Sequence, residues 1–411
     1  MTSPSMQDAV SADASTASGL DALMTQVGEA VANKTQIWIR AGNTKSWYGH
    51  RVEGADIAVR VDVRAHAGIV DYDPSELVIV ARAGTALEDI EALLARHGQM
   101  LPFEPPHFAP QAASRLPRES AKADDTISRA RGATLGGCIA AGLSGPRRMA
   151  AGAVRDFVLG ARVIDGRGQH LSFGGRVMKN VAGYDVSRAL AGSLGTLGVI
   201  TEVALKVLPR PVQTTTLSLE MNEESALDKL NAWGGMPVAI TASAWRPKAA
   251  GARSGRLMVR LEGGESAVQS GIRRIGGLDV DQAEAAAFWI GLREQNGSFF
   301  AARPPGLPLW RVALASTAPP LNAASLGFDD QLIEWGGALR WIATLADGGT
   351  IREAASSLGG HAILWRGSDA QKSQHGVFAP LSAPLMAIHR RLKTEFDPDR
   401  LFNRGRMYPE L

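Results

Sequence analysis

Three glycine-rich segments in the first 200 residues constrain this 411-residue chain more than any other feature of its sequence. They lie at residues 40–49, 132–148 and 192–198. Glycine adopts positive φ and lets a ligand approach the main chain, and successive N–H groups in such turns form concave sites for anions. Each segment taken alone could be an ordinary loop. Three of them in one half of the chain, each beside an expected strand, indicate a large phosphate-bearing ligand.

The spacing of these glycines excludes the common nucleotide-binding motifs. The motif G-x-G-x-x-G does not fit Gly192, Gly195 and Gly198, which recur at every third residue. Residues 42–46 resemble the end of a P-loop, but the glycine before the lysine and the earlier loop glycine are absent. The nucleophile motif G-x-S-x-G is also absent, because residues 142–145 place the second glycine one position early.

The composition is that of an ordinary folded chain, with 45% hydrophobic and 21% charged residues. The 44 basic and 41 acidic residues give a net charge of +3, which indicates no nucleic-acid partner. Cys138 is the only cysteine, so this chain can form neither an internal disulfide nor an iron–sulfur cluster held by its own cysteines. No apolar run reaches the roughly 18 residues of a membrane-spanning helix, and no signal sequence is evident. We therefore expect a cytoplasmic protein without a transmembrane segment.

Hydrophobic periodicity predicts an α+β chain with two main domains. We expect a disordered N-terminal tail at residues 1–18, a first domain at 19–211, a second at 212–380 and a C-terminal helix within 381–411. The boundary follows the proline-rich residues 208–211. Expected strands include residues 36–40, 56–63, 77–83, 158–164, 169–173 and 199–207 in the first domain. The second domain is expected to have strands at 214–219, 238–245, 256–261 and 309–315, and helices at 223–233, 265–275 and 281–295.

Thr85 and Glu88 have the spacing of a capping box, in which each side chain bonds a free main-chain N–H at the start of a helix. Apolar residues at helical spacing follow them. This pattern predicts a helix at residues 86–97, ended by Gly98.

Several longer patterns, in this order, resemble the FAD-binding fold of the vanillyl-alcohol oxidase class. They are R-x-G-N-T-x-x-x-x-G at residues 40–49, V-D-V at 61–63, L-x-x-x-A-x-A-G-T at 77–85 and S-G-P at 144–146. Residues 179–185 (KNVAGYD) and 192–200 (GSLGTLGVI) resemble its 2-hydroxy-acid dehydrogenase branch. Residues 99–106, 335–341, 359–366 and 396–403 then resemble the FAD-binding subunits of bacterial glycolate oxidases. The resemblance runs from about residue 20 to the C-terminus.

The resemblance implies a p-cresol methylhydroxylase (PCMH)-type FAD-binding domain of two α+β subdomains. An α+β cap domain with an antiparallel sheet follows, and the C-terminal helix returns to the flavin. The implied diphosphate-binding loops contain Gly42, Asn43, Thr44, Lys45 and Ser46, and Gly136, Gly137, Gly142, Ser144 and Gly145. The residues implied to flank the adenine and ribityl portions are Arg155, Asp156, Gly195, Thr196, Gly198 and Ile200, and Asn403 would approach the isoalloxazine ring. Lys45 could add charge at the rim or be a surface lysine.

The histidines decide two further expectations. Covalent attachment of FAD in this fold usually uses a histidine in the first glycine loop; here His50 lies beyond that loop, so we expect non-covalent FAD. Related dehydrogenases carry a closely spaced histidine pair that binds a metal, but the eight histidines here show no such spacing, so we expect no metal. His361 is the candidate base; the alternative is a strand histidine without a chemical role.

Arginines beside tryptophans are candidates for holding a substrate carboxylate. Arg311, Arg340 and Arg366 each adjoin a tryptophan, and a planar guanidinium can bind a carboxylate through two hydrogen bonds. We take Arg340 and Arg366, with His361, as the candidate catalytic residues. Alternatively, arginine–tryptophan stacking could brace the second domain or meet a partner subunit. Residues 147–148 with Arg155 form the densest local charge, which could face FAD phosphates, an acidic partner or solvent.

The resemblance implies an oxidoreductase subunit. FAD would take two electrons from a small 2-hydroxy acid, glycolate being oxidised to glyoxylate, and pass them to an iron–sulfur partner subunit. A larger flavin subunit would complete the complex, and any membrane association would run through these partners. The alternative is a structural or electron-relay flavin subunit that does not turn over substrate, which the missing histidine pair favours.

Overall fold

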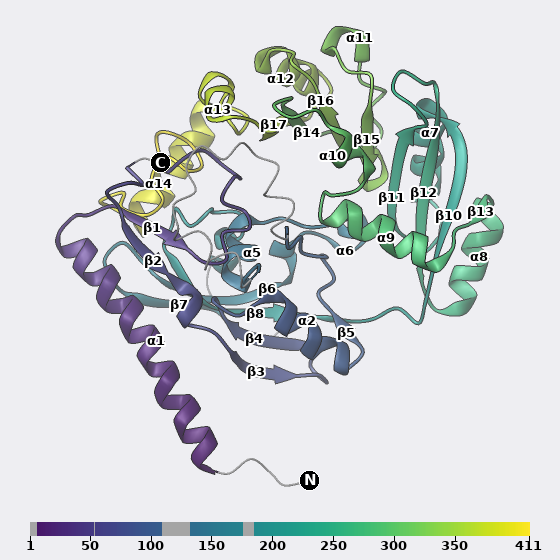
Figure 1. Ribbon diagram of the computed structural model, residues 1–411. Coiled ribbons are helices and arrows are strands. Elements are labelled where there is room, and N and C mark those ends of the chain that lie inside the picture. The colour runs from purple at the N-terminus through teal and green to yellow at the C-terminus, as the bar shows by residue number, and fades with distance from the viewer. Residues whose placement is uncertain (1–5, 53, 109–131, 176–184) are drawn as a thin grey trace.

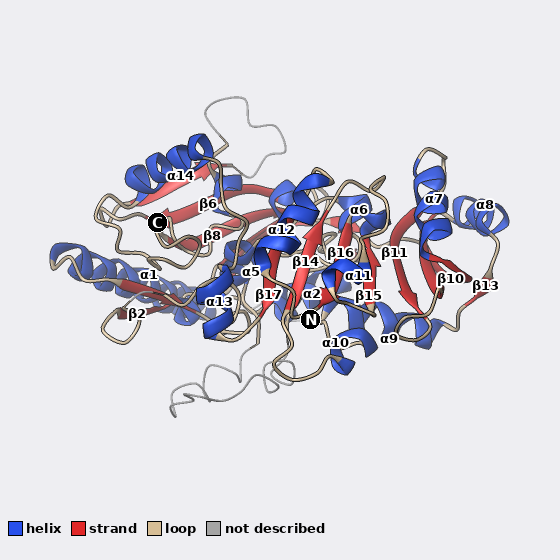
Figure 2. Cartoon of the chain, turned by 90° about the horizontal axis from the view of Figure 1, so that it is seen from above, coloured by secondary structure: helices blue, strands red, loops and turns tan. Residues whose placement is uncertain are grey.

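The computed structural model describes residues 6–52, 54–108, 132–175 and 185–411, which form two main sheets that lie side by side (Figure 1, Figure 2). Part of the residue 179–185 motif lies outside the described residues. None of the helices described is both long enough and apolar enough to cross a bilayer.

The first sheet is antiparallel and forms the core of the first half. Its strands, in spatial order, are β3 (Ile69–Asp73), β4 (Val78–Arg82), β8 (Val199–Lys206), β6 (Val158–Ile164) and β7 (His170–Gly174). Helices α2 (Leu87–Arg96) and α5 (Leu135–Ala141) pack against it through buried leucine and isoleucine side chains. The short elements of the first half are η1 (Val63–Ala65), β5 (Gln99–Met100), α6 (Arg148–Ala151), η2 (Val154–Phe157), η3 (Ser187–Leu190) and β9 (Leu208–Pro209).

Helix α2 forms where the sequence predicts it, but the predicted capping box is wrong. The Thr85 hydroxyl accepts a hydrogen bond from the Gly68 N–H (2.9 Å) and donates to the Arg82 carbonyl (2.7 Å). Ala86 is the N-cap residue, without a side-chain hydrogen bond. The Leu87 N–H donates instead to the Ala133 carbonyl (2.9 Å). A contact distant in sequence has therefore replaced the local cap.

A parallel pair of strands, β1 (Ile37–Arg40) and β2 (Val59–Asp62), lies between the N-terminal helix and the C-terminal segment. Helix α1 (Met6–Ala32) packs on this pair through Leu23, Val27 and Ala30. Residues 6–18 are helical where the sequence analysis expects a disordered tail, and their alanine content favours a helix.

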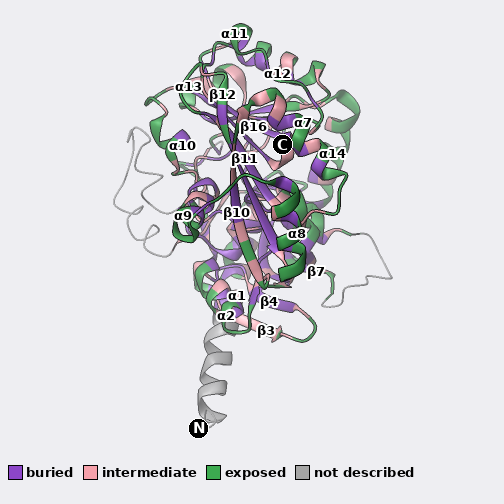
Figure 3. Cartoon of the chain, turned by 90° about the vertical axis from the view of Figure 1, so that its right-hand side faces the viewer, coloured by how far each residue is buried: buried purple, intermediate pink, exposed green. Residues whose placement is uncertain are grey.

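The second sheet is antiparallel throughout, as the sequence analysis expects. Its strands, in spatial order, are β13 (Leu278–Asp279), β10 (Gln213–Asn222), β12 (Ser254–Gly263), β11 (Ile240–Pro247), β15 (Gln331–Glu334), β16 (Leu339–Ala343), β14 (Leu309–Ala313) and β17 (His361–Arg366). Figure 3 shows β11 and β16 largely buried, whereas α8 (Glu265–Ile275) is mostly exposed.

The two faces of this second sheet are covered by different partners. One face packs against α7 (Glu223–Gly234), α8 and α12 (Gly348–Ser357). The other face packs against α9 (Gln282–Arg293), α10 (Ser298–Ala302) and residues of the first half. The remaining short elements are α11 (Ala323–Leu326), η4 (Trp335–Gly337) and α13 (Asp369–His375). The face toward the first half is therefore the one that can contribute to a shared site.

Helix α14 (Ala383–Phe396) returns the chain to the first half, where a buried ion pair fixes its end (Figure 1). The Lys393 Nζ donates to Asp397 Oδ2 (2.7 Å) and to the Thr196 carbonyl (2.6 Å). Asp397 is fully buried and also accepts from the N–H groups of Leu401 (2.9 Å) and Phe402 (2.8 Å). These bonds place residues 401–403 beside β1.

We expect Asp397→Ala to lower the free energy of unfolding by about 3–5 kcal/mol, because it leaves the buried Lys393 ammonium without its counter-charge. Asp399→Ala is the matched control: Asp399 forms a surface pair with Lys34 (3.5 Å), whose loss costs less than about 1 kcal/mol. Denaturant unfolding of the two variants checks this. Equal stability of the two variants would contradict the role given to Asp397.

Candidate functional site

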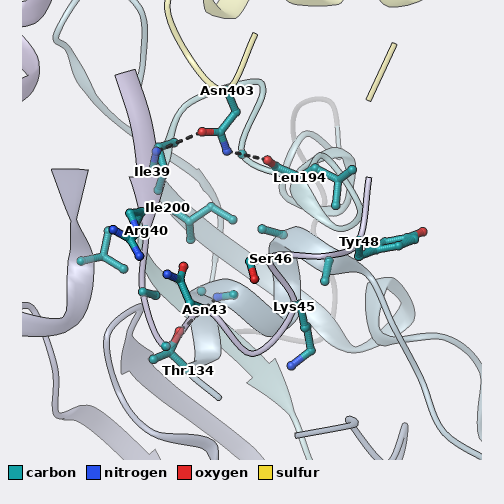
Figure 4. A pocket seen from close by; sticks show the side chains of 18 of the residues that line it. Ile39, Arg40, Asn43, Lys45, Ser46, Tyr48, Thr134, Leu194, Ile200 and Asn403 are labelled. Atoms are coloured by element: carbon teal, nitrogen blue, oxygen red, sulfur yellow. Dashed lines mark hydrogen bonds between the residues drawn. The ribbon is translucent and has the colours of Figure 1, made fainter. Parts of the chain in front are cut away.

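The glycine-rich segments meet in one pocket with an empty volume of about 840 Å³, open on one side. Its lining comes from the loop after β1, the start of α5, the loop before β8 and the C-terminal segment (Figure 4). We call it the first pocket. Its lining contains Trp38, Ile39, Arg40, Ala41, Gly42, Asn43, Thr44, Lys45, Ser46, Tyr48, Val63, Thr134, Gly136, Gly137, Ala140, Ala141, Leu194, Gly195, Gly198, Ile200, Asn403 and Arg406.

The carbonyl groups of the first glycine loop are held from outside by two cations. The Arg406 Nη2 donates to the carbonyls of Ser46 (2.9 Å) and Tyr48 (2.8 Å). The Lys372 Nζ, from α13, donates to the carbonyls of residues 47 (2.6 Å) and 49 (3.1 Å). Burial lowers the pKa of Lys372 to about 8 and that of Arg406 to about 10. The loop shape is therefore set by side chains from the C-terminal part of the chain.

The main-chain N–H groups of the same loop remain available for a ligand. Those of Asn43, Thr44 and Lys45 donate to no acceptor among the described residues. Asn43 has φ +55°, a left-handed conformation that turns successive N–H groups toward a common point. Gly42 is required here, because a Cβ atom would lie 1.8 Å from the Gly132 carbonyl oxygen. This arrangement suits a diphosphate.

Helix α5 contributes a surface rather than hydrogen-bond donors. The N–H groups of Leu135, Gly136 and Gly137 already donate to Thr85, Ala83 and Thr134. A Cβ atom at Gly137 would meet only the Thr134 Oγ1 within 4 Å (3.2 Å), so the remaining space beside Gly137 is open. Its role here is to let a ligand approach the main chain closely.

Asn403 joins three parts of this pocket. Its Oδ1 accepts from the Ile39 N–H (2.9 Å) and its Nδ2 donates to the Leu194 carbonyl (2.7 Å), as Figure 4 shows. A Cβ atom at Gly195 would lie 2.6 Å from the same Nδ2. The amide of Asn403 is thus engaged in holding the loop before β8 against β1.

Lys45 is partly buried and not an exposed surface lysine. It lines the first pocket, and its Nζ lies 3.3 Å from the Thr44 hydroxyl and 5.4 Å from the centre of the Phe108 ring. Burial lowers its pKa to about 8. Cys138, below the loop, is buried, and burial raises the pKa of its thiol to about 12, which is consistent with an unreactive core residue. His50 accepts a hydrogen bond from the Val377 N–H and does not line the pocket.

A second pocket, with an empty volume of about 550 Å³, adjoins the first. Tyr48 lines both pockets, and the end of α5 passes from one to the other. Its lining, which combines both halves of the chain, contains Tyr48, Pro106, Phe108, Gly142, Leu143, Ser144, Gly145, Pro146, Arg148, Leu292, Arg293, Gln295, Arg311, Glu334, Trp335, Leu339, Trp341 and Trp365.

Among the described residues, two guanidinium groups in the second pocket have no ion-pair partner within 4 Å. Arg148 and Arg311 form no hydrogen bond or ion pair with their side chains in the described part of the chain, and both stack on Trp335 (4.6 and 5.1 Å to the ring centre). Burial lowers the pKa of Arg311 to about 10, which leaves it charged at neutral pH. The hydroxyl of Tyr48 likewise has no partner among the described residues. Burial raises the pKa of Tyr48, so it stays protonated. The pocket therefore offers cations and a hydroxyl donor to an anion.

The candidate cofactor residues fall into three groups: those that line the first pocket, those that line the second pocket, and those that line neither. The first pocket is lined by Gly42, Asn43, Thr44, Lys45, Ser46, Gly136, Gly137, Gly195, Gly198, Ile200 and Asn403. The second pocket is lined by Gly142, Ser144 and Gly145. The lining of neither pocket includes Arg155, Asp156 or Thr196. Arg155 and Asp156 are exposed in η2, and the Thr196 hydroxyl donates to the Ser193 carbonyl.

None of the three candidate catalytic residues lines either pocket. Arg340 is fully buried and donates to the carbonyls of Ala318 and Pro319 (both 2.6 Å). It follows Leu339 and precedes Trp341 in β16, and alternate residues of a strand face opposite sides of the sheet. Arg366 stacks on Trp47 (3.3 Å to the ring centre). His361 is exposed at the start of β17.

Sequence reasoning missed several pocket residues. Arg311 was one of three similar arginines, Arg148 was part of a basic run, and Glu334 and Tyr48 carried no motif of their own. Strand alternation could have separated Arg311 from Arg340, because the pair Arg311–Trp341 in β14 and β16 shares one face.

Among the described residues, no three His, Cys, Asp or Glu side chains lie together as metal ligands would.

Comparisons with known proteins agree with this geometry. The FAD binding domain family matches residues 17–114. Over 390 residues the chain is 45% identical to the glycolate oxidase subunit GlcE of Escherichia coli (strain K12), an alignment that covers 95% of this chain and 97% of that protein. The chain belongs to the GlcE family of glycolate oxidase subunits. Its FAD binding domain confirms FAD as the cofactor.

More distant relatives share part of this GlcE-family chain or only its fold. A segment covering 23% of the chain is 40% identical to the glycolate oxidase subunit GlcD of Bacillus subtilis (strain 168), over 20% of that protein. The solved structure of p-cresol methylhydroxylase has a TM-score of 0.61 at 14% identity, covering 92% of this chain and 85% of that one. The solved structure of alkyldihydroxyacetonephosphate synthase has a TM-score of 0.59 at 16% sequence identity, and the match covers 93% of this chain and 74% of that one. These likenesses confirm the α+β PCMH-type fold.

We expect Gly137→Val to weaken FAD binding at least about tenfold, equivalent to about 1.4 kcal/mol, because its side chain would occupy the open side of the pocket. The fold should persist, since outside the backbone of its own helix the added Cβ atom contacts only the flexible Thr134 hydroxyl among the described residues. Gly28→Val is the matched control, because nothing lies within 4 Å of a Cβ atom there. Flavin content after gel filtration, with circular dichroism as the fold check, measures the effect. Full flavin occupancy in a folded Gly137→Val protein would contradict the assignment of this pocket.

Proposed function

We propose that this chain is the FAD-binding subunit of a glycolate oxidase complex, in which the first pocket holds FAD and the second binds the 2-hydroxy acid. The end-to-end similarity to GlcE and the shorter similarity to GlcD support membership of such a complex. A D-lactate dehydrogenase from Archaeoglobus fulgidus is 30% identical to this chain over 36% of its length. This similarity to another FAD-linked enzyme supports oxidation of a CH–OH group.

The observation that carries the substrate assignment is the pair of guanidinium groups in the second pocket that have no ion-pair partner within 4 Å among the described residues. Arg148 and Arg311 can each donate two hydrogen bonds to a carboxylate, and both stack on the ring of Trp335, which helps to hold them in place. The Tyr48 hydroxyl can donate to an oxygen at the boundary of the two pockets. A small hydroxy acid such as glycolate presents both kinds of oxygen.

The first pocket residues hold the cofactor by their main chains. The N–H groups of residues 43–45 would bind the FAD diphosphate, and Gly137 and Gly195 would let it approach closely. FAD supplies the two-electron oxidation of the substrate when it is bound. We expect it to bind without a covalent bond, because His50 is engaged with Val377 outside the lining.

Electrons would leave to an iron–sulfur partner subunit. A cluster needs several cysteine ligands, and Cys138 is the only cysteine in the chain. A larger flavin subunit would complete the complex. The cytoplasmic location expected from the sequence stays a prediction.

A second candidate is a structural or electron-relay flavin subunit that does not oxidise substrate itself. The absence of a closely spaced histidine pair in the sequence favours it. Anaerobic addition of glycolate to the purified, FAD-loaded chain separates the two. Loss of the oxidised-flavin band supports direct oxidation. A band that persists, while the assembled complex loses its own band, supports the relay role and contradicts the proposal.

We expect Arg311→Ala to raise the apparent KM for glycolate at least about tenfold, because a charged hydrogen bond to the carboxylate is lost. Arg253→Ala, which removes an exposed arginine of the same half, is the control and should leave KM unchanged. Steady-state kinetics of the complex with an artificial electron acceptor measure both. An unchanged KM for Arg311→Ala would remove this residue from the substrate site.

A further inference from the structure

Glu334 is the acidic side chain that lines the second pocket. It ends β15, is 4% exposed, and pairs with Leu339 of β16 and Ala244 of β11 in the sheet register. Strand alternation places it on the same face as Trp341 and Arg311. A carboxyl group is therefore buried in the same pocket as two cations that form no ion pair within 4 Å among the described residues, at the place where the substrate is proposed to bind.

The two oxygens of Glu334 are in different situations. Oε1 accepts a hydrogen bond from the Trp341 indole N–H at 2.6 Å, which fixes the orientation of the carboxyl group. Oε2 has no partner among the described residues, and Glu334 has no ion pair within 4 Å there. One oxygen is thus anchored and the other is free to accept a proton or a hydrogen bond.

The titratable and charged groups around Glu334 narrow the choice of a proton acceptor. Arg311 of β14 and Arg148 of α6 line the same pocket, as do Tyr48 and Arg293. Glu104 lies farther away but close enough to raise the pKa of Glu334. Arg311 and Tyr48 are protonated at neutral pH, and His361 is outside the lining. Among the described lining residues, Glu334 alone can take up a proton near neutral pH.

We propose that Glu334 is the catalytic base of this subunit, accepting the hydroxyl proton of the 2-hydroxy acid on Oε2. The inference rests on the proposed function of the second pocket. The hydroxyl O–H bond breaks and its proton passes to Glu334. The α-carbon C–H bond breaks and its hydrogen leaves with the electron pair, for which FAD is the two-electron acceptor. The C–O bond becomes a carbonyl, and Arg148 and Arg311 hold the carboxylate throughout.

This assignment predicts a particular pH dependence. Burial raises the pKa of Glu334 to about 7, while the Trp341 hydrogen bond and Arg311 act in the opposite direction. The base is therefore mostly protonated at pH 6 and mostly ionised at pH 8. Substrate oxidation should become faster as pH rises through about 7. Affinity for an anion should fall over the same interval, because the ionised carboxylate removes one positive unit from the net charge of the pocket.

The experiment compares wild-type protein with Glu334→Gln, which keeps an oxygen acceptor for the Trp341 N–H. Glu224→Gln, an exposed acid of α7, is the matched control. Calorimetric titration with oxalate, which has no oxidisable C–H bond, measures anion binding to the FAD-loaded chain between pH 6 and 8. We expect the oxalate affinity of wild-type and Glu224→Gln proteins to fall about tenfold over this interval and that of Glu334→Gln to stay constant.

The second measurement is the rate of anaerobic flavin reduction by glycolate. Glu334→Gln should slow it at least about a hundredfold at pH 8, which is the usual contribution of a positioned base, while oxalate binding persists. Reduction at the wild-type rate with intact oxalate binding would overturn the role of Glu334 and leave the proposed function standing. Loss of both oxalate binding and reduction in Arg311→Ala supports the substrate site independently. Failure of wild-type protein to bind oxalate at any pH would overturn the proposed function itself.

Discussion

The geometry of the first glycine loop is the constraint on which the rest of the site depends. Four consecutive carbonyls, from Ser46 to Gly49, are held by Arg406 and Lys372, two cations that arrive from the last 40 residues of the chain. With the carbonyls engaged there, the N–H groups of residues 43–45 remain without acceptors in the described protein. The loop can therefore offer a preset anion site made of main-chain N–H groups, beside the partly buried Lys45 of the same pocket lining.

A chain of contacts also connects the C-terminal segment to the boundary with the second pocket. The Lys393–Asp397 pair places residues 401–403, and Asn403 then holds the Leu194 loop against β1. Tyr48, at the end of the first loop, reaches the boundary of the two pockets. The second sheet completes the arrangement by presenting one face, with its alternate side chains, toward this boundary. The two pockets are thus built by one set of contacts between the two halves of the chain.

Local patterns in the sequence predicted most of the fold. Strand β6 and helix α8 have the predicted bounds, because the periodicity of apolar residues in each depends only on neighbours. The glycine loops were recognised because positive φ and close approach leave few alternatives to glycine.

The predicted capping box failed because the Thr85 hydroxyl has partners on residue 68, which no local pattern encodes. Arg340 was misjudged for a related reason: residues adjacent in a strand face opposite sides of the sheet, so proximity in sequence to Trp341 does not place its guanidinium in the pocket. Arg148, Arg311 and Glu334 come together only through the tertiary fold.

The most direct test of the central claim is hydrogen–deuterium exchange of the main-chain amides at residues 43–45, measured with and without FAD. If these N–H groups bind the diphosphate, FAD should slow their exchange at least about tenfold, since each amide then donates to a fixed acceptor. The amides of Leu135, Gly136 and Gly137, already bonded within the protein, should change less. Unchanged exchange at residues 43–45 in fully FAD-loaded protein would contradict the account.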